Sequence, residues 1–162
     1  MRTRTWTPCR VMLMGKTCPG RTVTVVSPEG YALPTRLLDA ARAAAARAGG
    51  SVSETCDRRA GYADADVVYV KSWASPADYG RPEADLARRA PLRDWCVDES
   101  WFAASKPHAK FMHCLPVRRN VKVSDQVLDG PRSVVVKQAQ NRLHVQKALL
   151  LTLLGADRAL KP

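Results

Sequence analysis

The chain has 162 residues, of which 46% are hydrophobic and 25% are charged, and its formal net charge is +11. This length and composition indicate one soluble globular domain and exclude a disordered or fibrous chain. The longest apolar run, at 148–154, is far shorter than the roughly 18 to 20 residues that a bilayer crossing needs, so we expect a cytoplasmic protein without a membrane-spanning segment.

The basic charge and the cysteines do not point to nucleic acid or to a metal. Arginine doublets at 58–59, 88–89 and 118–119 are scattered along the chain, with no interleaved aromatic residues or recognisable nucleic-acid module beside them. The charge fits a solvated basic surface or an anionic substrate better than nucleic acid. Five cysteines at irregular spacing, without a CxxC pair, indicate reduced thiols rather than a zinc site.

The first half of the chain predicts strands alternating with a helix. We assign no firm structure to residues 1–20, and we expect a buried β-branched strand within 21–28. The segment 34–50 predicts a helix, because it opens on a proline, carries one broad apolar face and ends in a double glycine suited to a left-handed cap. Two further strands are expected at 51–55 and 66–71, separated by a short connection.

The second half continues this alternation and closes on a long helix. Its apolar patterns predict a helix at 97–105, a strand at 110–115, a short helix at 124–129 capped by Ser124, a strand at 133–136 and a helix within 138–155.

These elements predict an α/β fold with a doubly wound, mainly parallel sheet of about five strands and flanking helices. Ligands of such sheets bind beyond the carboxyl ends of the strands. Two loops in that position carry unusual residues, KSWASPADYG at 71–80 and HCLPVRRNV at 113–121. Both loops are therefore the predicted place of a binding site.

Cys114 and His113 stand together at the end of a predicted strand. The Cys114 thiol could be a nucleophile, a ligand or a small buried apolar residue, of which the last is commonest. Because neighbouring side chains of a strand point to opposite faces, we do not expect a protease-like pair of Cys114 and His113.

The residues that follow could recognise an amine and a carboxylate. A proline directly after a strand, as at Leu115-Pro116, can hold a cis peptide and turn carbonyl oxygens toward a ligand. Arg118 and Arg119 could grip a carboxylate or phosphate, or could be solvated surface residues. Lys71 could be an ordinary edge lysine or a partner of a substrate carboxylate.

Arg142 is placed by the sequence in about the first turn of the last helix. Backbone N-H groups and the helix dipole favour an anion there, and a guanidinium would strengthen such a site. The alternative is a surface salt bridge.

Taken together, residues 111–155 resemble the C-terminal signature of the aspartate/ornithine carbamoyltransferase superfamily. The stretch joins HCLP, a helix ending in DGP, SVVV and the NRLHVQKAL helix in the family's order, and the resemblance reaches back to about residue 21. It implies that 21–162 form the amino-acid (ornithine)-binding domain. HCLPVRRNV and VVYVKSWAS resemble the N-acetylornithine or N-succinylornithine type, whereas the ornithine type typically has HCLPAHRG and a DxWxSMG loop.

The resemblance implies transfer of the carbamoyl group of carbamoyl phosphate to the terminal amine of an N-acylated ornithine, with no metal or organic cofactor. Cys114 and the Leu115 carbonyl would hold the amine, and Arg142 would polarise the carbamoyl oxygen. Lys71 and Arg118 would bind the carboxylate, and the HCLP residues His113 and Pro116 would line the substrate site. Family members are homotrimers, and the acylornithine branch threads this domain through a knot.

The chain also departs from the family pattern. Family members carry an N-terminal carbamoyl-phosphate domain with SxRT and HPxQ motifs, and neither context is present in this sequence. We therefore expect a truncated enzyme that does not catalyse transfer alone. Ornithine carbamoyltransferase and a non-catalytic amino-acid-binding or oligomerisation module remain the alternative functions.

Overall fold

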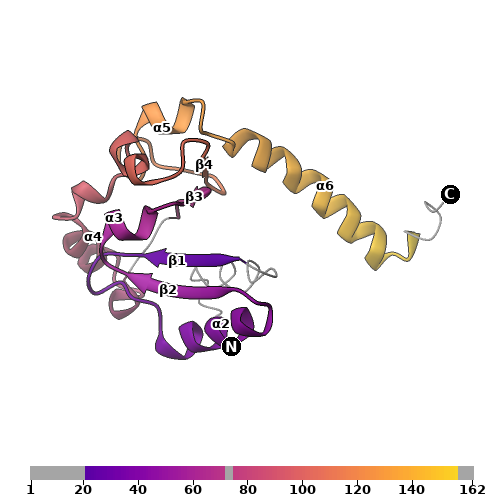
Figure 1. The fold of residues 1–162 in the computed structure, drawn as a ribbon, viewed down its shortest axis with the longest axis horizontal. Coiled ribbons are helices and arrows are strands. Elements are labelled where there is room, and N and C mark those ends of the chain that lie inside the picture. Colours follow the sequence, from indigo (N-terminus) through magenta and orange to yellow (C-terminus); the bar gives the residue numbers. More distant parts are fainter. Residues whose placement is uncertain (1–20, 72–74, 157–162) are drawn as a thin grey trace.

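Four short strands and the helices between them form the body of the molecule in the computed structural model, which describes residues 21–71 and 75–156 (Figure 1). The expectations for residues 1–20 lie outside the described residues. The strands are β1 (Thr22–Val26), β2 (Ser51–Thr55), β3 (Val67–Tyr69) and β4 (Lys110–Met112). The α-helices are α2 (Thr35–Arg47), α3 (Arg58–Tyr62), α4 (Pro82–Arg89), α5 (Asp125–Asp129) and α6 (Val135–Leu153), and 3-10 turns span Pro76–Asp78, Arg93–Trp95 and Glu99–Ala104.

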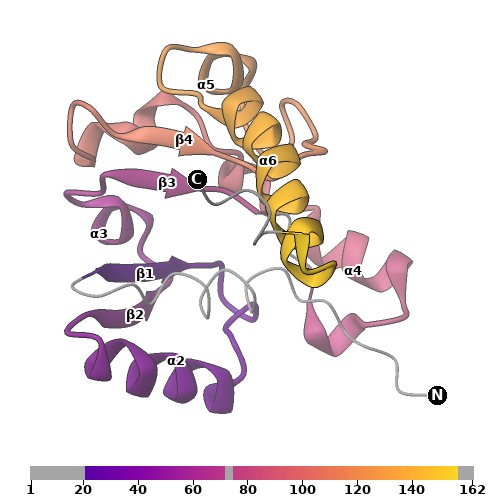
Figure 2. The ribbon, with the colours of Figure 1, turned by 90° about the vertical axis from the view of Figure 1, so that its right-hand side faces the viewer.

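The strands pair in parallel, which confirms the predicted α/β class. β1 pairs with β2 from Thr22↔Ser51 to Val26↔Thr55, and β3 pairs with β4 from Val67↔Lys110 to Tyr69↔Met112. In both views the strands follow the order β2, β1, β3, β4 (Figures 1 and 2). The described residues nevertheless form two two-stranded sheets, whereas we expected one sheet of about five strands.

The predicted fifth strand at 133–136 is wrong. Phe111 N donates to Arg132 O at 2.8 Å and Val134 N donates to Phe111 O at 3.0 Å, so this segment adds one bridge beside β4. Helix α6 then begins at Val135, whose side chain is buried. A short apolar run satisfies burial equally well as a strand or as the first turn of a helix, and periodicity does not distinguish the two.

The predicted helix at 97–105 is instead a 3-10 segment, Glu99–Ala104. Asp98 caps it by accepting a hydrogen bond from Ser100 N. The other predicted helices are confirmed: Gly49 after α2 has the left-handed φ of 70°, and Ser124 caps α5 by accepting from Val127 N. Side-chain caps thus mark the starts of α3 and α5, whereas α2, α4 and α6 begin without a side-chain cap hydrogen bond.

Two apolar cores hold the body together. The smaller one packs the buried face of α2 against β1 and β2, as the sequence predicts, and the larger one surrounds β3 and β4. The smaller core contains Leu33, Leu38, Ala41, Ala45 and Val52. The larger core contains Val68, Val70, Val97, Phe102, Ala109, Phe111, Val123, Val127, Leu128 and Val135.

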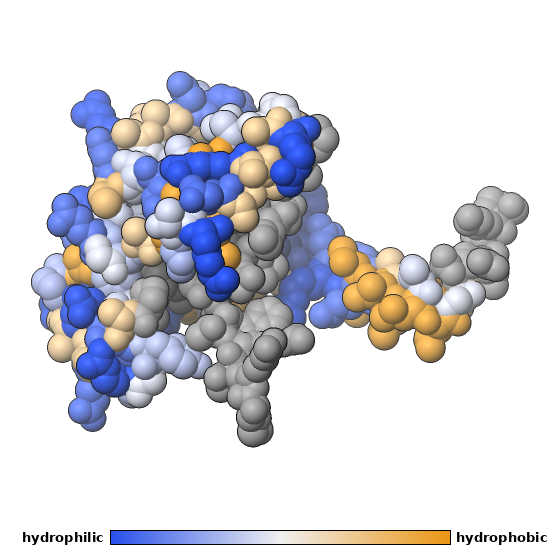
Figure 3. All heavy atoms as spheres, turned by 90° about the horizontal axis from the view of Figure 1, so that it is seen from below, coloured by the Kyte–Doolittle hydropathy of each residue, from blue (hydrophilic) through white to orange (hydrophobic). Residues whose placement is uncertain are grey.

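Helix α6 leaves this body and projects away from it (Figure 1). Only its first residue, Val135, is buried among the helix residues, and its main contact with another element is with β4. Among the described residues, most apolar side chains along this helix are therefore exposed (Figure 3). Among the described helices, none is both long and apolar enough to cross a membrane.

The larger core provides a matched test of burial. Replacing Val127, which is 0% exposed, by alanine removes two buried methyl groups and should lower the free energy of unfolding by about 2 kcal/mol. Replacing Val136, which is 77% exposed on α6, by alanine should change it by less than about 0.5 kcal/mol. Urea denaturation measures both values, and equal losses would contradict this assignment of the core.

Candidate active site

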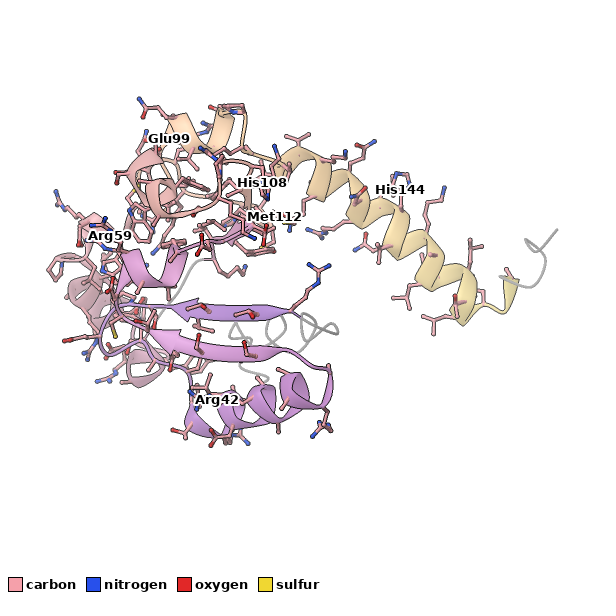
Figure 4. All side chains as sticks on the ribbon, viewed as in Figure 1. Arg42, Arg59, Glu99, His108, Met112 and His144 are labelled. Carbon is pink, nitrogen blue, oxygen red and sulfur yellow. The ribbon has the colours of Figure 1, made fainter. Side chains whose placement is uncertain are left out.

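The carboxyl ends of β3 and β4 bring the two predicted loops together. Val70 N donates to Met112 O at 3.0 Å, which extends the pairing one residue beyond β3. Met112 marks this end of β4 in Figure 4. Lys71 follows on one strand and His113 and Cys114 follow on the other, so residues far apart in the sequence become neighbours.

Lys71 and Cys114 are in direct contact. Lys71 Nζ donates a hydrogen bond to Cys114 Sγ at 2.9 Å, and both side chains are half-buried. Cys114 is a free thiol. The strand ends thus place an ammonium group beside a sulfur atom at the predicted binding edge.

Tyr69 and Gln138 extend this cluster, and sequence reasoning missed both. Gln138 Nε2, from the first turns of α6, donates to the Tyr69 hydroxyl at 3.0 Å. Burial raises the pKa of Tyr69 despite this bond, and the neighbouring Cys114 acts in the same direction. The alternation of strand side chains offers one signal, because Tyr69 lies two residues before Lys71 and shares its face.

His113 is buried, with an exposed fraction of 1%. Its Nδ1 accepts a hydrogen bond from Leu115 N at 2.9 Å, so the neutral ring carries its proton on Nε2. Nε2 is buried without a hydrogen-bond partner among the described residues. Burial lowers the pKa of His113 and the Lys71 ammonium adds to the effect, which keeps the ring neutral.

The Leu115-Pro116 peptide is cis, in agreement with the prediction from its position after a strand. Leu115 itself has a φ of 48° and is half-buried, whereas Pro116 is exposed. His113 Nδ1 accepts from the backbone amide of Leu115, so the histidine fixes the backbone directly after Cys114.

The two arginines of the loop differ in their partners. The Arg119 guanidinium forms ion pairs with Asp125 at 2.7 Å and Asp129 at 2.6 Å, and these bonds hold the pKa of both carboxyls below its usual value. Arg118 is exposed, and among the described residues its side chain forms no hydrogen bond or ion pair. Arg119 thus anchors the loop to α5, while Arg118 remains available to a ligand.

Lys122 is a buried lysine that no sequence motif singles out. Only 5% of it is exposed, and burial lowers its pKa to about 8, with Arg89 and Arg118 acting in the same direction. Its backbone oxygen accepts from Val97 N at 3.0 Å, which joins this loop to the larger core.

Arg142 lies on α6, one turn beyond Gln138, and not at the end of a strand. The prediction that it occupies about the first turn of the last helix is wrong, because α6 begins at Val135 and Arg142 falls in its third turn. Its side chain is exposed and forms no hydrogen bond or ion pair with any residue that the structure describes. The strand ends therefore bring together Lys71, His113, Cys114 and Leu115, and α6 carries Arg142.

Residues 9–153 match the family model described as aspartate/ornithine carbamoyltransferase, Asp/Orn binding domain. The chain belongs to this family. The resemblance seen in the sequence is thereby confirmed over most of the chain.

Similar relatives carry two different substrate names. Ornithine carbamoyltransferase of Rhodococcus opacus is 38% identical over 151 residues, covering 93% of this chain and 47% of that protein. N-acetylornithine carbamoyltransferase of Xanthomonas campestris pv. campestris is 41% identical over 140 residues, covering 86% of this chain and 41% of that protein. The chain spans about half the length of these relatives.

Solved structures show the same fold at similar identity. Acetylornithine transcarbamylase complexed with acetylcitrulline is 39% identical with a TM-score of 0.82, over 90% of this chain and 43% of that one. A variant of N-acetyl-L-ornithine transcarbamylase complexed with carbamyl phosphate and N-succinyl-L-norvaline gives the same TM-score of 0.82.

The burial of His113 predicts a pH dependence of stability. Because the pKa of His113 is lower in the folded chain than its ordinary value of 6.5, the unfolded chain binds the extra proton first as the pH falls. The contribution of neutral His113 is complete above about pH 6.5, and it declines as the pH falls from there toward the folded pKa. Replacing His113 by asparagine, which still offers an acceptor to Leu115 N, should flatten the stability profile between pH 7 and 5.

Urea denaturation across this pH range measures the effect. The control is His144→Gln, on the projecting part of α6 (Figure 4), which should leave the profile unchanged. A profile that is identical in wild type and His113→Asn would contradict the lowered pKa.

Proposed function

We propose that this chain is the amino-acid-binding half of a carbamoyltransferase of arginine biosynthesis that acts on an N-acylated ornithine. The observation that carries the proposal is the contact of Lys71 Nζ with Cys114 Sγ at 2.9 Å. It supports the acylated substrate because it puts a cation, and not a carboxylate, at the edge where the amino acid binds.

The charge of the substrate's α-nitrogen decides which substrate is compatible with the Lys71 cation. Free ornithine presents an α-ammonium, which needs an anionic partner, whereas an acylated nitrogen is neutral. Two like charges about 4 Å apart repel by roughly 1 to 4 kcal/mol at a partly hydrated protein surface. Among the described residues, no carboxylate forms an ion pair with Lys71, and Arg118 adds a second cation nearby in the loop sequence.

The proposed reaction needs positioning more than reactive groups. The neutral terminal amine attacks the carbonyl carbon of carbamoyl phosphate, a C–N bond forms, the C–O bond to phosphate breaks and the amine loses a proton. We assign the amine to Cys114 Sγ and the Leu115 carbonyl, and the substrate carboxylate to Lys71 and Arg118. Four methylene groups let the Lys71 ammonium reach a carboxylate while Cys114 faces the amine.

His113 and Pro116 shape the loop in this scheme, and Arg142 polarises the carbamoyl oxygen. Holding two reactants in line and stabilising developing charge can supply most of such an acceleration. The phosphate-holding residues would come from the other half of the enzyme, since the matched relatives are about twice as long as this chain.

Transfer to free ornithine is the second candidate, because several of the similar relatives are ornithine carbamoyltransferases. Titration calorimetry of the purified chain with N-acetylornithine and with ornithine separates the two. The proposal predicts binding of N-acetylornithine at least tenfold tighter than ornithine, and a preference for ornithine would refute it. Formation of N-acetylcitrulline from carbamoyl phosphate, once a carbamoyl-phosphate-binding half is added, tests the reaction.

Lys71 offers a charge reversal that tests the basis of this preference. Replacing Lys71 by aspartate should weaken binding of N-acetylornithine, because an anion then faces the substrate carboxylate. It should also reduce the preference over ornithine, because the α-ammonium of ornithine is attracted to that anion. Calorimetry with both ligands measures the change as a ratio of dissociation constants. Lys71→Met, which removes the charge without reversing it, should fall between wild type and Lys71→Asp; an unchanged ratio in both variants would contradict a role for the Lys71 charge.

Arg118 provides a test of carboxylate binding. Replacing Arg118 by glutamine removes a charge-assisted hydrogen bond and should weaken N-acetylornithine binding about tenfold or more. Arg59→Gln, an exposed position on α3 (Figure 4), is the matched control and should not change the affinity. Equal affinities in wild type and Arg118→Gln would remove Arg118 from the site.

A further inference from the structure

Lys71 and Cys114 place two groups that can act as nucleophiles in direct contact. The Nζ and Sγ atoms are 2.9 Å apart, although Lys71 follows β3 and Cys114 follows β4. In the proposed reaction each group binds a different part of the substrate, so the bonding chemistry open to the pair is not used. A nitrogen held against a sulfur is the arrangement that a sulfur–nitrogen bond requires, because the two reacting atoms need no further encounter.

The surroundings of Cys114 favour a small oxidant over a bulky one. Cys114 is a free thiol and is half-buried. Burial raises the pKa of Tyr69 and the neighbouring Cys114 adds to the effect, so an uncharged phenol lies beside the sulfur, and Gln138 Nε2 donates to its hydroxyl at 3.0 Å. A peroxide therefore reaches the sulfur more easily than a peptide thiol does, and the nitrogen that meets the oxidised sulfur is Lys71 Nζ.

We propose that Cys114 is a reversible oxidation site whose sulfur, once oxidised by a peroxide, bonds covalently to Lys71 Nζ. The bond itself follows from the contact at 2.9 Å between the two atoms. Its effect on the amino acid rests on the proposed function, because the bond removes both the thiol assigned to the amine and the ammonium assigned to the carboxylate. A thiol reductant returns both groups.

Two steps form this bond. First, the Cys114 sulfur attacks a peroxide oxygen, the O–O bond breaks, and water leaves with the thiol proton; the sulfur is oxidised by two electrons to a sulfenic acid and the peroxide is reduced. Second, the Lys71 ammonium gives a proton to solvent, and the resulting amine attacks the sulfur. The S–N bond forms, the S–O bond breaks, and the oxygen leaves as water with a second nitrogen proton. This step changes no oxidation state.

Cys56 provides an internal comparison. It is an exposed free thiol that forms no hydrogen bond with a lysine among the described residues. Excess peroxide should therefore carry Cys56 through sulfenic to sulfinic acid, which thiols do not reduce. At Cys114 the neighbouring nitrogen captures the sulfenic acid before a second peroxide attacks. The contact thus predicts different products for the two thiols.

Mass spectrometry of the purified chain after treatment with hydrogen peroxide tests the proposal. The expected product is a tryptic cross-link between the segment that contains Lys71 and residues 111–118, lighter than the two separate peptides by two hydrogen atoms. Trypsin should no longer cleave after Lys71, because the bonded nitrogen is not an ammonium. Dithiothreitol should restore both separate peptides.

Two lysine variants separate this contact from general oxidation. Lys71→Met should abolish the cross-link and leave a sulfenic acid at Cys114 that dimedone captures. The control Lys106→Met, which removes a lysine paired with Asp66 at 2.9 Å, should leave the cross-link unchanged. Thermal melting shows that each variant is folded. Wild-type Cys114 that ends as sulfinic acid, or a cross-link that persists in Lys71→Met, would overturn the proposal.

Titration calorimetry with N-acetylornithine distinguishes this oxidation site from the proposed function. After removal of the peroxide, the cross-linked chain should bind at least tenfold more weakly than the reduced chain, and dithiothreitol should restore the affinity. A cross-linked chain that binds as tightly as the reduced chain would refute the assignment of Lys71 and Cys114 to the substrate and leave the oxidation site standing. Absence of the cross-link would overturn the oxidation site, whatever the affinity.

Discussion

The parallel pairing of β3 with β4 is the constraint on which the candidate site depends. Each strand is only three residues long, so backbone hydrogen bonds alone would not hold the pair. Burial of Val68 at 2% and Phe111 at 0% supplies the missing stability from the larger core. Since the carboxyl ends of parallel strands lie at the same edge of a sheet, this packing makes Lys71 and Cys114 neighbours.

Local chemistry made part of this structure predictable. The β-branched runs predict β1 and β2, and Ser124 and the double glycine mark helix ends, because caps and glycine conformations act within a few residues. The segment 133–136 could not be assigned correctly, because its choice between strand and helix depends on Phe111 and on the start of α6. The apolar pattern likewise predicts a helix at α6, but it does not tell whether anything covers that helix.

The sequence likewise predicts some features of the site and not others. The motif residues Lys71, Cys114 and Leu115 meet because strand ends meet, which the sequence pattern already implies. The different tasks of Arg118 and Arg119 are not visible in the sequence, since Asp125 and Asp129 approach only after α5 packs. The Nδ1 bond of His113 and the burial of Lys122 are tertiary effects of the same kind. Among the described residues, Arg119 therefore holds the loop to α5, whereas Arg118 forms no ion pair.

In the proposed site, one amino acid spans the edge from Cys114 to Lys71 and Arg118. A crystal structure of the chain with N-acetylcitrulline, the product of the proposed reaction, tests this claim most directly. We predict that its ureido group lies against Cys114 Sγ and the Leu115 carbonyl, with its carboxylate between Lys71 and Arg118. Density for the ligand elsewhere, or in the reverse orientation, would contradict the account.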